Sequence, residues 1–448
     1  MEPINYKISK YTKLFWENKK LYVYNTANGL KANIFEDDLI EQIKRLNNGE
    51  MISSDEIDNR LVNTGICIQD FVDEDAVVQD LITHTLTNDY TSLRLIILPT
   101  RECNLRCVYC YENKRAEYMH DETVRNLIEA IKKYIVEKHI KSLVIEWFGG
   151  EPLLSYELII KISAELMSFC NDNYIDYSML MTTNGYLLDK QRAEELLKYN
   201  LFSYQITIDG DRKFHDRLRV KKDGGATWDV IYNNLLKLKD IKSDRLDITI
   251  RINYHIEMLE TIEDFLLKLK SDFNDQRFKF YLIKINPPAN VDLDFDCVTN
   301  RTEVIAMDYI FDILDNNNIG LDKYLPNLNP MSAVCYGRMN NSFVIDVDGT
   351  IRKCTEYLED DKLNNLGNIS NGRFNIDQKV HSQWLYPNPK FLSDKGCFHC
   401  QDYPICCGGV CPIYWLRENS LSCSIYHAFS DKILKMYFEQ KSQMGDVE

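Results

Sequence analysis

The chain has 448 residues, of which 45% are hydrophobic and 27% are charged, and its formal net charge is −15. This length allows roughly two to four domains with a large core, and the composition is typical of globular proteins. No apolar run reaches the roughly 18 residues of a membrane span, and the N-terminus lacks the apolar core of a secretory signal. The acidic charge argues against a nucleic-acid partner. We expect a cytoplasmic protein without membrane or nucleic-acid partners.

The N-terminal part of the chain predicts a small α+β domain. Apolar patterns of strand length cover Lys13–Trp16, Lys20–Tyr24 and Leu30–Ile34. Helical spacing follows from Asp37 to Asn47, and a capping-box pattern at Ser53–Glu56 predicts that another helix begins there.

Strands and helices then alternate, which predicts a parallel sheet and, with six such units, a partial β/α barrel. The predicted strands are Leu93–Leu98, Leu143–Phe148, Tyr177–Thr182, Tyr204–Ile208, Ile248–Asn253 and Phe278–Ile285. Predicted helices between them include Asp121–Glu137, Tyr156–Asn171 and Lys190–Tyr199. In such barrels the loops that follow the strands carry the functional site.

A cysteine triplet follows the first of these strands. Cys103, Cys107 and Cys110 have the spacing C-x3-C-x2-C, and the aromatic Tyr109 precedes the third cysteine. Three thiolates can hold three irons of a cubane cluster and leave the fourth iron open for chemistry. A zinc site or three unrelated thiols would be the alternative. Fourteen cysteines in a cytoplasmic chain favour metal ligation over disulfides.

Polar motifs follow the next strands. The glycines of Phe148–Pro152 let the backbone approach a ligand closely. Thr182–Gly185 and Thr207–Gly210 place short polar side chains where they can bind hydroxyl groups, although Asn and Asp before Gly also form ordinary turns. Arg251 interrupts an apolar strand, and a buried cation needs an anion, either a ligand or a structural salt-bridge partner.

The cysteines crowd near the C-terminus, where eight of the fourteen lie between Cys335 and Cys423. The order is Cys335-x13-Gly349-x4-Cys354, then Cys397-x2-Cys400-x5-Cys406, then Cys411 and Cys423. A zinc ribbon made by Cys397, Cys400, Cys406 and Cys411 is the alternative to iron–sulfur clusters here, but it leaves the other cysteines of this pattern unexplained. A helix is expected from about His427 to Gln440.

The triplet, with the motifs after the later strands, resembles the radical S-adenosylmethionine (radical SAM) superfamily. The C-terminal spacing resembles the SPASM domain. The resemblance implies an α/β fold: a partial (β/α)6 TIM-type barrel at 91–290, a winged-helix-like module for peptide recognition at 1–90, a bridging region at 291–330, a loop-rich iron–sulfur domain at 331–425, and a C-terminal helix at 426–448. It also implies S-adenosyl-L-methionine (SAM) and three 4Fe-4S clusters as cofactors.

The resemblance implies the site residues as well. The SAM cluster would be held by Cys103, Cys107 and Cys110, and SAM would be bound by Tyr109, Gly149, Gly150, Glu151, Asn184, Asp209 and Arg251. In particular, the GGEP segment would meet the SAM amino group, and Arg251 is a candidate for its carboxylate. The stretch His215–Asp229 resembles a loop and helix start of the same subgroup, which we interpret as architecture near the substrate. No catalytic side chain is assigned.

By the same resemblance, Cys335, Cys354 and Cys411 serve an inner auxiliary cluster, and Cys397, Cys400, Cys406 and Cys423 serve an outer one. The gap from Cys406 to Cys411 is one residue longer than the family spacing; Cys407 would restore this gap but spoil the preceding one, so we favour Cys406. Members that modify sulfatases typically have a further cysteine between the first two, and this chain has none. The inner cluster therefore has one iron without an apparent ligand. A substrate cysteine, water, a non-substrate thiol or a distant residue such as Cys297 could fill this position.

These features predict an enzyme that modifies a ribosomally made peptide, forming thioether crosslinks through a 5′-deoxyadenosyl radical. The alternatives are sulfatase-type oxidation of Cys or Ser, carbon–carbon crosslinking, and a non-enzymatic electron carrier or peptide-binding scaffold. The expected partners are a precursor peptide with its leader and a low-potential electron donor such as a flavodoxin or ferredoxin.

Overall fold

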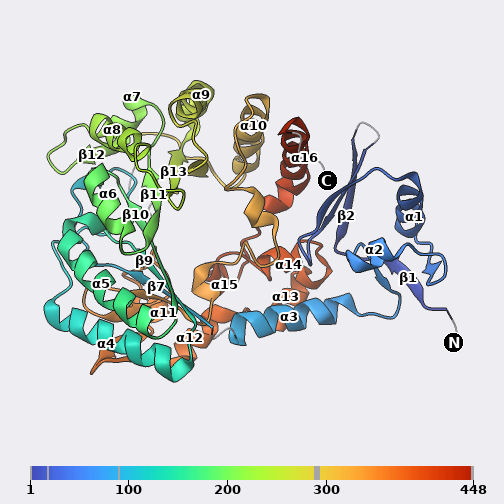
Figure 1. Cartoon of the computed structure of the whole chain (residues 1–448), viewed down its shortest axis with the longest axis horizontal. Coiled ribbons are helices and arrows are strands. Elements are labelled where there is room, and N and C mark those ends of the chain that lie inside the picture. Colours follow the sequence, from blue (N-terminus) through green and yellow to red (C-terminus); the bar gives the residue numbers. More distant parts are fainter. Residues whose placement is uncertain (1–2, 18–19, 89–90, 287–292, 445–448) are drawn as a thin grey trace. The chain divides into compact units, whose positions relative to one another are not determined.

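The computed structural model describes residues 3–17, 20–88, 91–286 and 293–444. Contacts between residues divide the chain into two compact units. The terminal unit comprises Met1–Asn88, Leu321–Arg338 and Leu385–Glu448, and the sheet unit comprises Asp89–Gly320 and Met339–Trp384. Figure 1 shows the elements of both units coloured along the chain.

The sheet unit contains a ten-stranded sheet with the order β14-β13-β11-β10-β9-β7-β15-β16-β17-β18. The first six strands in this order are parallel, and they follow one another consecutively in the chain apart from the short β8 and β12. They are β7 (Ser92–Ile97), β9 (Ser142–Trp147), β10 (Asp176–Thr183), β11 (Leu201–Thr207), β13 (Asp247–Tyr254) and β14 (Phe278–Lys284). The predicted α/β class and the six predicted strands are therefore confirmed, with ends shifted by at most three residues.

Helices connect these strands, and Figure 1 shows α4, α5, α6 and α8 along one side of them. The α-helices are α4 (Asp121–Lys138), α5 (Tyr156–Asp172), α6 (Lys190–Leu197), α7 (Arg212–Leu218), α8 (Trp228–Leu238), α9 (Ile262–Asp272) and α10 (Glu303–Asn316). Shorter elements are β8 (Leu105–Cys107), η1 (Pro152–Ser155), β12 (Arg219–Lys221) and η2 (Ile256–Glu260). Apolar periodicity explains the packing: in β9 the side chains of Leu143, Ile145 and Trp147 are buried and those between them are not.

The sheet continues into residues that the sequence assigned to the C-terminal domain. β15 (Ser342–Ile345) pairs in parallel with β7, and antiparallel strands follow it. These later elements are β16 (Thr350–Arg352), α11 (Asp361–Asn364), β17 (Gly367–Ser370), β18 (Arg373–Ile376) and α12 (Gln378–Leu385). The compact units thus divide the predicted 331–425 domain, because backbone pairing with β7 makes its first half part of the sheet.

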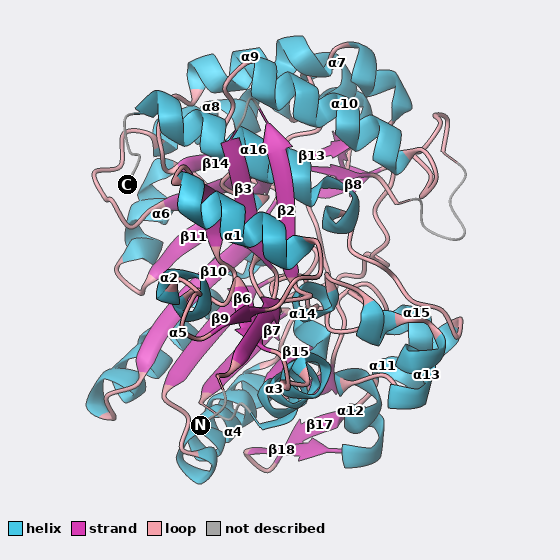
Figure 2. Ribbon diagram, turned by 90° about the vertical axis from the view of Figure 1, so that its right-hand side faces the viewer, coloured by secondary structure: helices cyan, strands magenta, loops and turns pink. Residues whose placement is uncertain are grey.

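The terminal unit joins both ends of the chain. Its N-terminal elements are β1 (Asn5–Ile8), β2 (Thr12–Glu17), β3 (Lys20–Asn25), β4 (Lys31–Ile34), α1 (Asp37–Asn47), β5 (Ile52–Ser53), α2 (Asn59–Asn63), β6 (Cys67–Gln69) and α3 (Glu74–Asn88). They form two three-stranded sheets, β2-β3-β4 and β5-β1-β6. Figure 2 shows α1 lying across β2 and β3, where Ile43 and Leu46 pack with Leu21 and Val23.

The predicted helix start at Ser53–Glu56 is wrong. Ser53 ends β5, a turn follows it, and α2 begins at Asn59. The N-cap is Asp58, whose carboxylate accepts the amide of Arg60 at 2.8 Å. An aspartate at this position accepts a hydrogen bond from an amide of the first helical turn. The helix therefore begins several residues after the predicted capping box.

The C-terminal elements of the terminal unit are short, apart from the last helix. They are η3 (Leu325–Leu328), η4 (Tyr336–Arg338), α13 (Pro389–Asp394), η5 (Cys397–His399), α14 (Tyr403–Cys406), α15 (Pro412–Arg417) and α16 (Tyr426–Met444). The N-terminal strands contact them directly: Lys10 donates to the carbonyl of Phe398 at 2.9 Å, and Lys13 pairs with Asp402 at 2.8 Å. The predicted 1–90 domain is therefore integrated with the cysteine-rich end. The predicted boundaries at 90 and 290–291, and the last four residues of the predicted C-terminal helix, lie outside the described residues.

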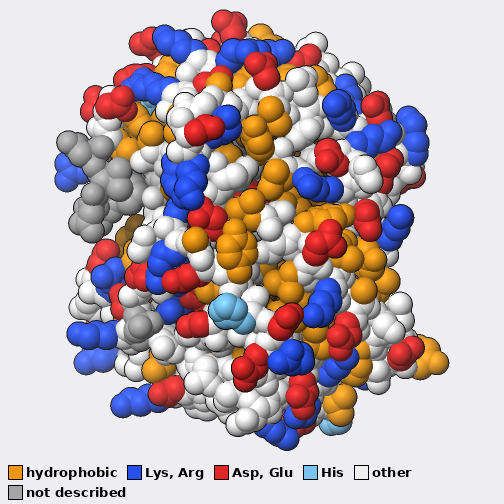
Figure 3. All heavy atoms as spheres, turned by 90° about the vertical axis from the view of Figure 1, so that its left-hand side faces the viewer, with side chains coloured by type: hydrophobic (Ala, Val, Ile, Leu, Met, Phe, Trp, Pro, Cys, Tyr) orange, Lys and Arg blue, Asp and Glu red, His pale blue; other side chains and the backbone are white. Residues whose placement is uncertain are grey.

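None of the described helices is both long and apolar enough to cross a membrane. Acidic and basic side chains are interspersed on the described part of the face drawn in Figure 3, so the net negative charge is not gathered there into one acidic field.

Candidate functional site

A pocket of about 170 Å³ lies where the parallel strands of the sheet unit end. Cys103, Cys107 and Cys110 all line it, so the structure brings the predicted triplet together. The segment that carries them is pinned by β8, which pairs antiparallel with β12 and sets Cys107 opposite Arg219. Burial raises the pKa of the Cys103 thiol to about 12. A cationic metal centre would supply the charge that lets such a buried thiol bind as thiolate, and the soft sulfur donors fit an iron–sulfur cluster.

β13 supplies two pocket residues through its alternation. Ile248, Ile250 and Ile252 are fully buried on one face of the strand, whereas Arg251 and Asn253 line the pocket. The side chains of Arg251 and Asn253 are joined by a 2.9 Å hydrogen bond from Nε to Oδ1. The polar interruption seen in the sequence is therefore the pocket-facing side of the strand.

Tyr109 is the centre of a hydrogen-bond network in this pocket. Its hydroxyl accepts from Arg219 at 2.8 Å and from Asn253 at 3.0 Å, and it donates to Asp209. Asp209 also accepts from the backbone and side-chain amides of Asn253 at 3.1 and 3.0 Å, and it lies 3.7 Å from the Arg219 guanidinium. Asp209 is fully buried, and its carboxylate is occupied by these protein donors.

His215 and Thr227 support this network from behind. The Asp209 amide donates to His215 Nδ1 at 3.3 Å, so the other ring nitrogen carries the proton and donates to the Thr227 hydroxyl at 3.1 Å. That hydroxyl donates to the Arg219 carbonyl at 2.5 Å. Burial lowers the pKa of His215 well below its usual range, which keeps the ring neutral. This arrangement agrees with the interpretation of the 215–229 stretch as architecture.

The glycine motif brings two loops into contact. A Cβ on Gly149 would lie 2.5 Å from the Thr100 carbonyl oxygen, and one on Gly150 would lie 2.2 Å from that of Glu102. Only glycine permits this approach between the loop after β9 and the cysteine loop. Gly149 and Gly150 line the pocket, as does Asn184, whose side-chain amide donates to Asn104 at 2.8 Å.

Glu151 has a different role in the structure from the two glycines. Its buried carboxylate accepts from the Leu153 amide at 3.1 Å, from the Thr183 hydroxyl at 2.8 Å and from the Asn184 amide at 2.8 Å. These bonds tie the end of β9 to the end of β10. Glu151 is not among the residues that line the described pocket.

Several pocket residues were not singled out from the sequence: Lys114, Arg219, Asn253, Lys284 and Glu356. Arg219 is the most informative of them, because its Nε is buried and has no hydrogen-bond partner among the described residues. Lys284 ends β14 and interrupts an apolar run in the sequence, as Arg251 does within β13, which was an available signal. Lys114 pairs with Glu112 at 3.4 Å, and no sequence pattern pointed to it. The pocket is rich in cations that could meet an anionic ligand.

Cys354 lies in a turn of the sheet unit that is fixed by Asn364. The Asn364 side chain accepts from the amides of Lys353 and Cys354 at 2.8 and 2.9 Å and donates to the carbonyls of Cys354 and Tyr357 at 2.7 and 2.9 Å. The same turn carries Glu356 into the pocket. Cys354 is therefore two residues from the pocket lining.

Cys335 and Cys411 belong to the terminal unit. The Cys335 amide donates to the carbonyl of Val410 at 3.3 Å, so the segment before η4 runs beside the segment that contains Cys411. Cys297, one of the candidates for the open inner-cluster iron, is not among the residues that line the described pocket.

The four cysteines assigned to the outer cluster lie close enough to influence one another. Burial, together with the neighbouring Cys406, Cys423 and Cys400, raises the pKa of Cys397 to about 11. Cys407, in contrast, is fully buried, and its thiol donates to the carbonyl of Pro404 at 3.7 Å. This geometry favours Cys406 over Cys407 as the member of the group.

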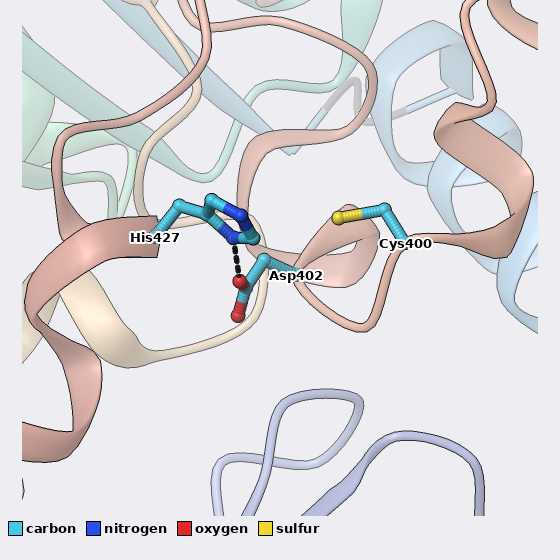
Figure 4. A group of neighbouring side chains, drawn as sticks. All are labelled: Cys400, Asp402 and His427. Carbon is cyan, nitrogen blue, oxygen red and sulfur yellow. Dashed lines mark hydrogen bonds and ion pairs between the residues drawn. The ribbon is translucent and has the colours of Figure 1, made fainter.

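Cys400 also lies beside the hydrogen-bonded pair of Asp402 and His427, shown in Figure 4. His427 Nδ1 contacts a carboxylate oxygen of Asp402, and the ligand atoms of these three residues all lie within 4.8 Å of one another. However, Asp402 is already paired with Lys13 at 2.8 Å. A separate metal ion would have to displace this lysine, so the group fits better as surroundings of the outer cysteines.

Comparisons with known proteins agree with this site. Residues 97–269 match the model of the radical SAM superfamily. The matched residues include the cysteine triplet and the parallel strands from β9 to β13. The chain is 26% identical over 342 residues to a cysteine-type anaerobic sulfatase-maturating enzyme of Clostridium novyi, covering 71% of this chain and 87% of that protein.

Two solved structures share the fold. Native anSMEcpe with bound AdoMet and the Kp18Cys peptide has a TM-score of 0.56 at 20% identity, covering 79% of this chain and 98% of that one. Streptococcus suis SuiB bound to the precursor peptide SuiA has a TM-score of 0.52 at 16% identity, covering 94% and 99%. The similarity to this superfamily and to a sulfatase-maturating enzyme supports an enzyme that acts on peptides. This sets aside the alternative of a non-enzymatic electron carrier.

Proposed function

We propose that this radical SAM enzyme crosslinks a ribosomally made precursor peptide by forming thioether bonds, using SAM and three 4Fe-4S clusters. A cluster held by Cys103, Cys107 and Cys110 would supply the electron that splits bound SAM into methionine and a 5′-deoxyadenosyl radical, and that radical would take a hydrogen atom from the substrate. The pocket residues described above bind and orient the cofactors and keep water away from the reacting atoms. A flavodoxin or ferredoxin would supply the electron.

The pocket geometry supports the proposal that different residues bind different groups of SAM. Gly149 and Gly150 bring backbone groups to the pocket, where they could meet the SAM ammonium. Arg219, with its unpartnered Nε, and Arg251 are the candidates for the carboxylate. Tyr109, Asn184 and Asp209 would shape the site around the ligand. Glu151 and Asp209 would act mainly through the protein bonds that already occupy their carboxylates.

The observation that carries the thioether chemistry is the position of Cys354. Cys354 lies in a turn with Glu356, which lines the pocket proposed for SAM, and residues 336–353 contain no further cysteine. An inner cluster with the three cysteine ligands that the sequence spacing predicts would thus have one iron open. A substrate thiolate bound there would lie near the radical, since thiolates are the natural ligands of such irons.

The proposed reaction balances without an external oxidant. For each link the peptide gives one hydrogen atom to the deoxyadenosyl radical, one proton from its thiol to solvent and one electron to the auxiliary cluster. The product is therefore lighter by two hydrogens per link and keeps its sulfur.

Mass spectrometry of the reacted precursor tests this proposal. We expect the two-hydrogen loss to require the substrate cysteine, and fragmentation to place the link between that sulfur and a carbon. Modification of a cysteine-free precursor at the normal rate would exclude thioether formation and favour carbon–carbon crosslinking.

The similarity to a sulfatase-maturating enzyme over 87% of its length supports oxidation of a single Cys or Ser as the second candidate. Oxidation of a cysteine to an aldehyde removes its sulfur, whereas a thioether keeps it. The same spectrum therefore separates the two reactions.

A further inference from the structure

Arg338 is a fully buried cation in the terminal unit, three residues after Cys335. Its guanidinium donates to the carbonyls of Cys406, Cys407 and Gly409 at 3.0, 2.8 and 2.6 Å. A longer contact of 3.4 Å reaches the carbonyl of Leu385. All of these acceptors are neutral.

The described residues provide no carboxylate for this guanidinium. Its other neighbours include the rings of Trp415 and Tyr386, at 5.2 and 5.9 Å, and the thiols of Cys406 and Cys407. Arginine stays charged in proteins, and a buried charge without a counter-ion is costly. An anionic group must therefore lie close by in the functional protein.

The loop that faces Arg338 has an unusual backbone. Cys407, Gly408 and Gly409 have consecutive positive φ angles of 53°, 82° and 109°. A left-handed conformation is unfavourable for a cysteine, so the fold must compensate for it. This backbone turns the carbonyls of residues 406, 407 and 409 toward one cation.

The amides of the same loop point to a sulfur atom. The backbone N–H groups of Gly408 and Gly409 hydrogen-bond the Cys406 thiol. Successive amides that face one atom form an anion-binding nest. The loop thus presents its N–H groups to Cys406 and its carbonyls to Arg338.

We propose that Arg338 is the buried counter-charge of the outer iron–sulfur cluster and holds the amide nest around its ligand Cys406. The inference rests on the proposed outer cluster, whose four thiolates would give it a net negative charge. A nearby cation and N–H bonds to sulfur stabilise the reduced, more negative state, so Arg338 raises the reduction potential. This would make the cluster a better electron acceptor.

The test separates the charge of Arg338 from its hydrogen bonds. Arg338→Gln removes the charge, Arg338→Lys keeps it with fewer bonds, and Arg417→Gln removes a charge from an exposed position of α15 as a matched control. Each holoenzyme is titrated with a reductant while electron paramagnetic resonance follows the clusters. The outer-cluster signal is identified by its loss in Cys406→Ser.

In Arg338→Gln we expect the equilibrium constant for one-electron reduction of the outer cluster to fall at least tenfold. This corresponds to a shift of its reduction potential by about 59 mV to a lower value. Arg338→Lys should shift less, and Arg417→Gln should match the parent enzyme. An unchanged potential in Arg338→Gln with full iron content would overturn the inference.

Loss of the cluster is also decisive. If Arg338→Gln loses the outer-cluster iron and Arg338→Lys keeps it, the counter-charge is supported. If both lose it equally, Arg338 is only a clamp for the carbonyls. Iron analysis of the parent enzyme tests the premise: iron for one cluster per chain would refute the proposed cluster set itself, independently of Arg338.

Discussion

The parallel sheet and the cysteine-rich end of the chain position their cysteines by different means. In the sheet unit, strands in consecutive order place Arg251 and Asn253 in the pocket, and the β8–β12 ladder pins the cysteine loop. In the terminal unit, Cys406 lies in a loop held by a buried arginine through carbonyl oxygens. Backbone ladders tolerate many side-chain changes, whereas a loop held by one side chain depends on that residue. The two regions should therefore respond differently to mutation.

The largest expected effect comes from removing the ligands in the sheet unit. Replacement of Cys103, Cys107 and Cys110 by Ala should abolish formation of 5′-deoxyadenosine from SAM, measured by liquid chromatography, because no cluster could then bind at the pocket. The iron bound by the auxiliary sites should remain. Cys170→Ala, a buried cysteine of α5 outside the pocket, is the control and should keep activity. SAM cleavage at the parent rate in the triple variant would refute the radical SAM assignment of this site.

The adjacent Cys406 and Cys407 provide a test in the terminal unit, where a loop positions the proposed ligand. We expect Cys406→Ser to lower the iron content by about one cluster per chain, because serine oxygen is a poor ligand for iron–sulfur irons. Cys407→Ser should retain the iron, since its thiol is turned to the Pro404 carbonyl. Iron analysis with electron paramagnetic resonance measures both. The opposite result would make Cys407 the ligand.

Sequence reasoning succeeded where local pattern determines structure. Period-two burial identified the strand that carries Arg251, and the cysteine spacing identified a group that the fold does bring together. It did not find Lys114 or Glu356, because each reaches the pocket through a loop whose path depends on distant packing. The pairing of β15 with β7 was missed for the same reason: it joins residues about 250 positions apart, and no local signal marks such a partner.

The hydrogen bonds that join His215, Thr227 and Arg219 behind the pocket provide a smaller but more specific test of the sheet unit. Thr227→Val removes the hydroxyl between His215 and the Arg219 carbonyl while keeping the side-chain shape. A buried hydrogen-bonding group left unpaired costs about 1–3 kcal/mol, so we expect the KM for SAM to rise roughly tenfold with unchanged iron content. Thr227→Ser keeps the hydroxyl and should restore the KM. Equal behaviour of the two variants would show that only packing matters there.

The smallest expected effect concerns the N-terminal sheet, whose role in binding the leader peptide remains a prediction. β4 is an edge strand, and the 3.0 Å bond from the Asn25 amide to the Leu30 carbonyl sets the alternation of the ladder. By that alternation the amides of Lys31 and Asn33 face away from β3. We propose that the leader adds to this edge as a further strand.

Asn33→Pro removes one outward amide, and Asn33→Ala is its matched control. Because one net hydrogen bond contributes about 1 kcal/mol, Asn33→Pro should weaken leader binding several-fold in fluorescence anisotropy, with SAM cleavage unchanged. A point change is preferable to deletion of residues 1–90, because Lys10 and Lys13 contact the cysteine-rich segment and deletion would disturb the proposed outer cluster. Equal leader affinity in both variants and the parent would place the leader elsewhere and leave these strands as support for that cluster.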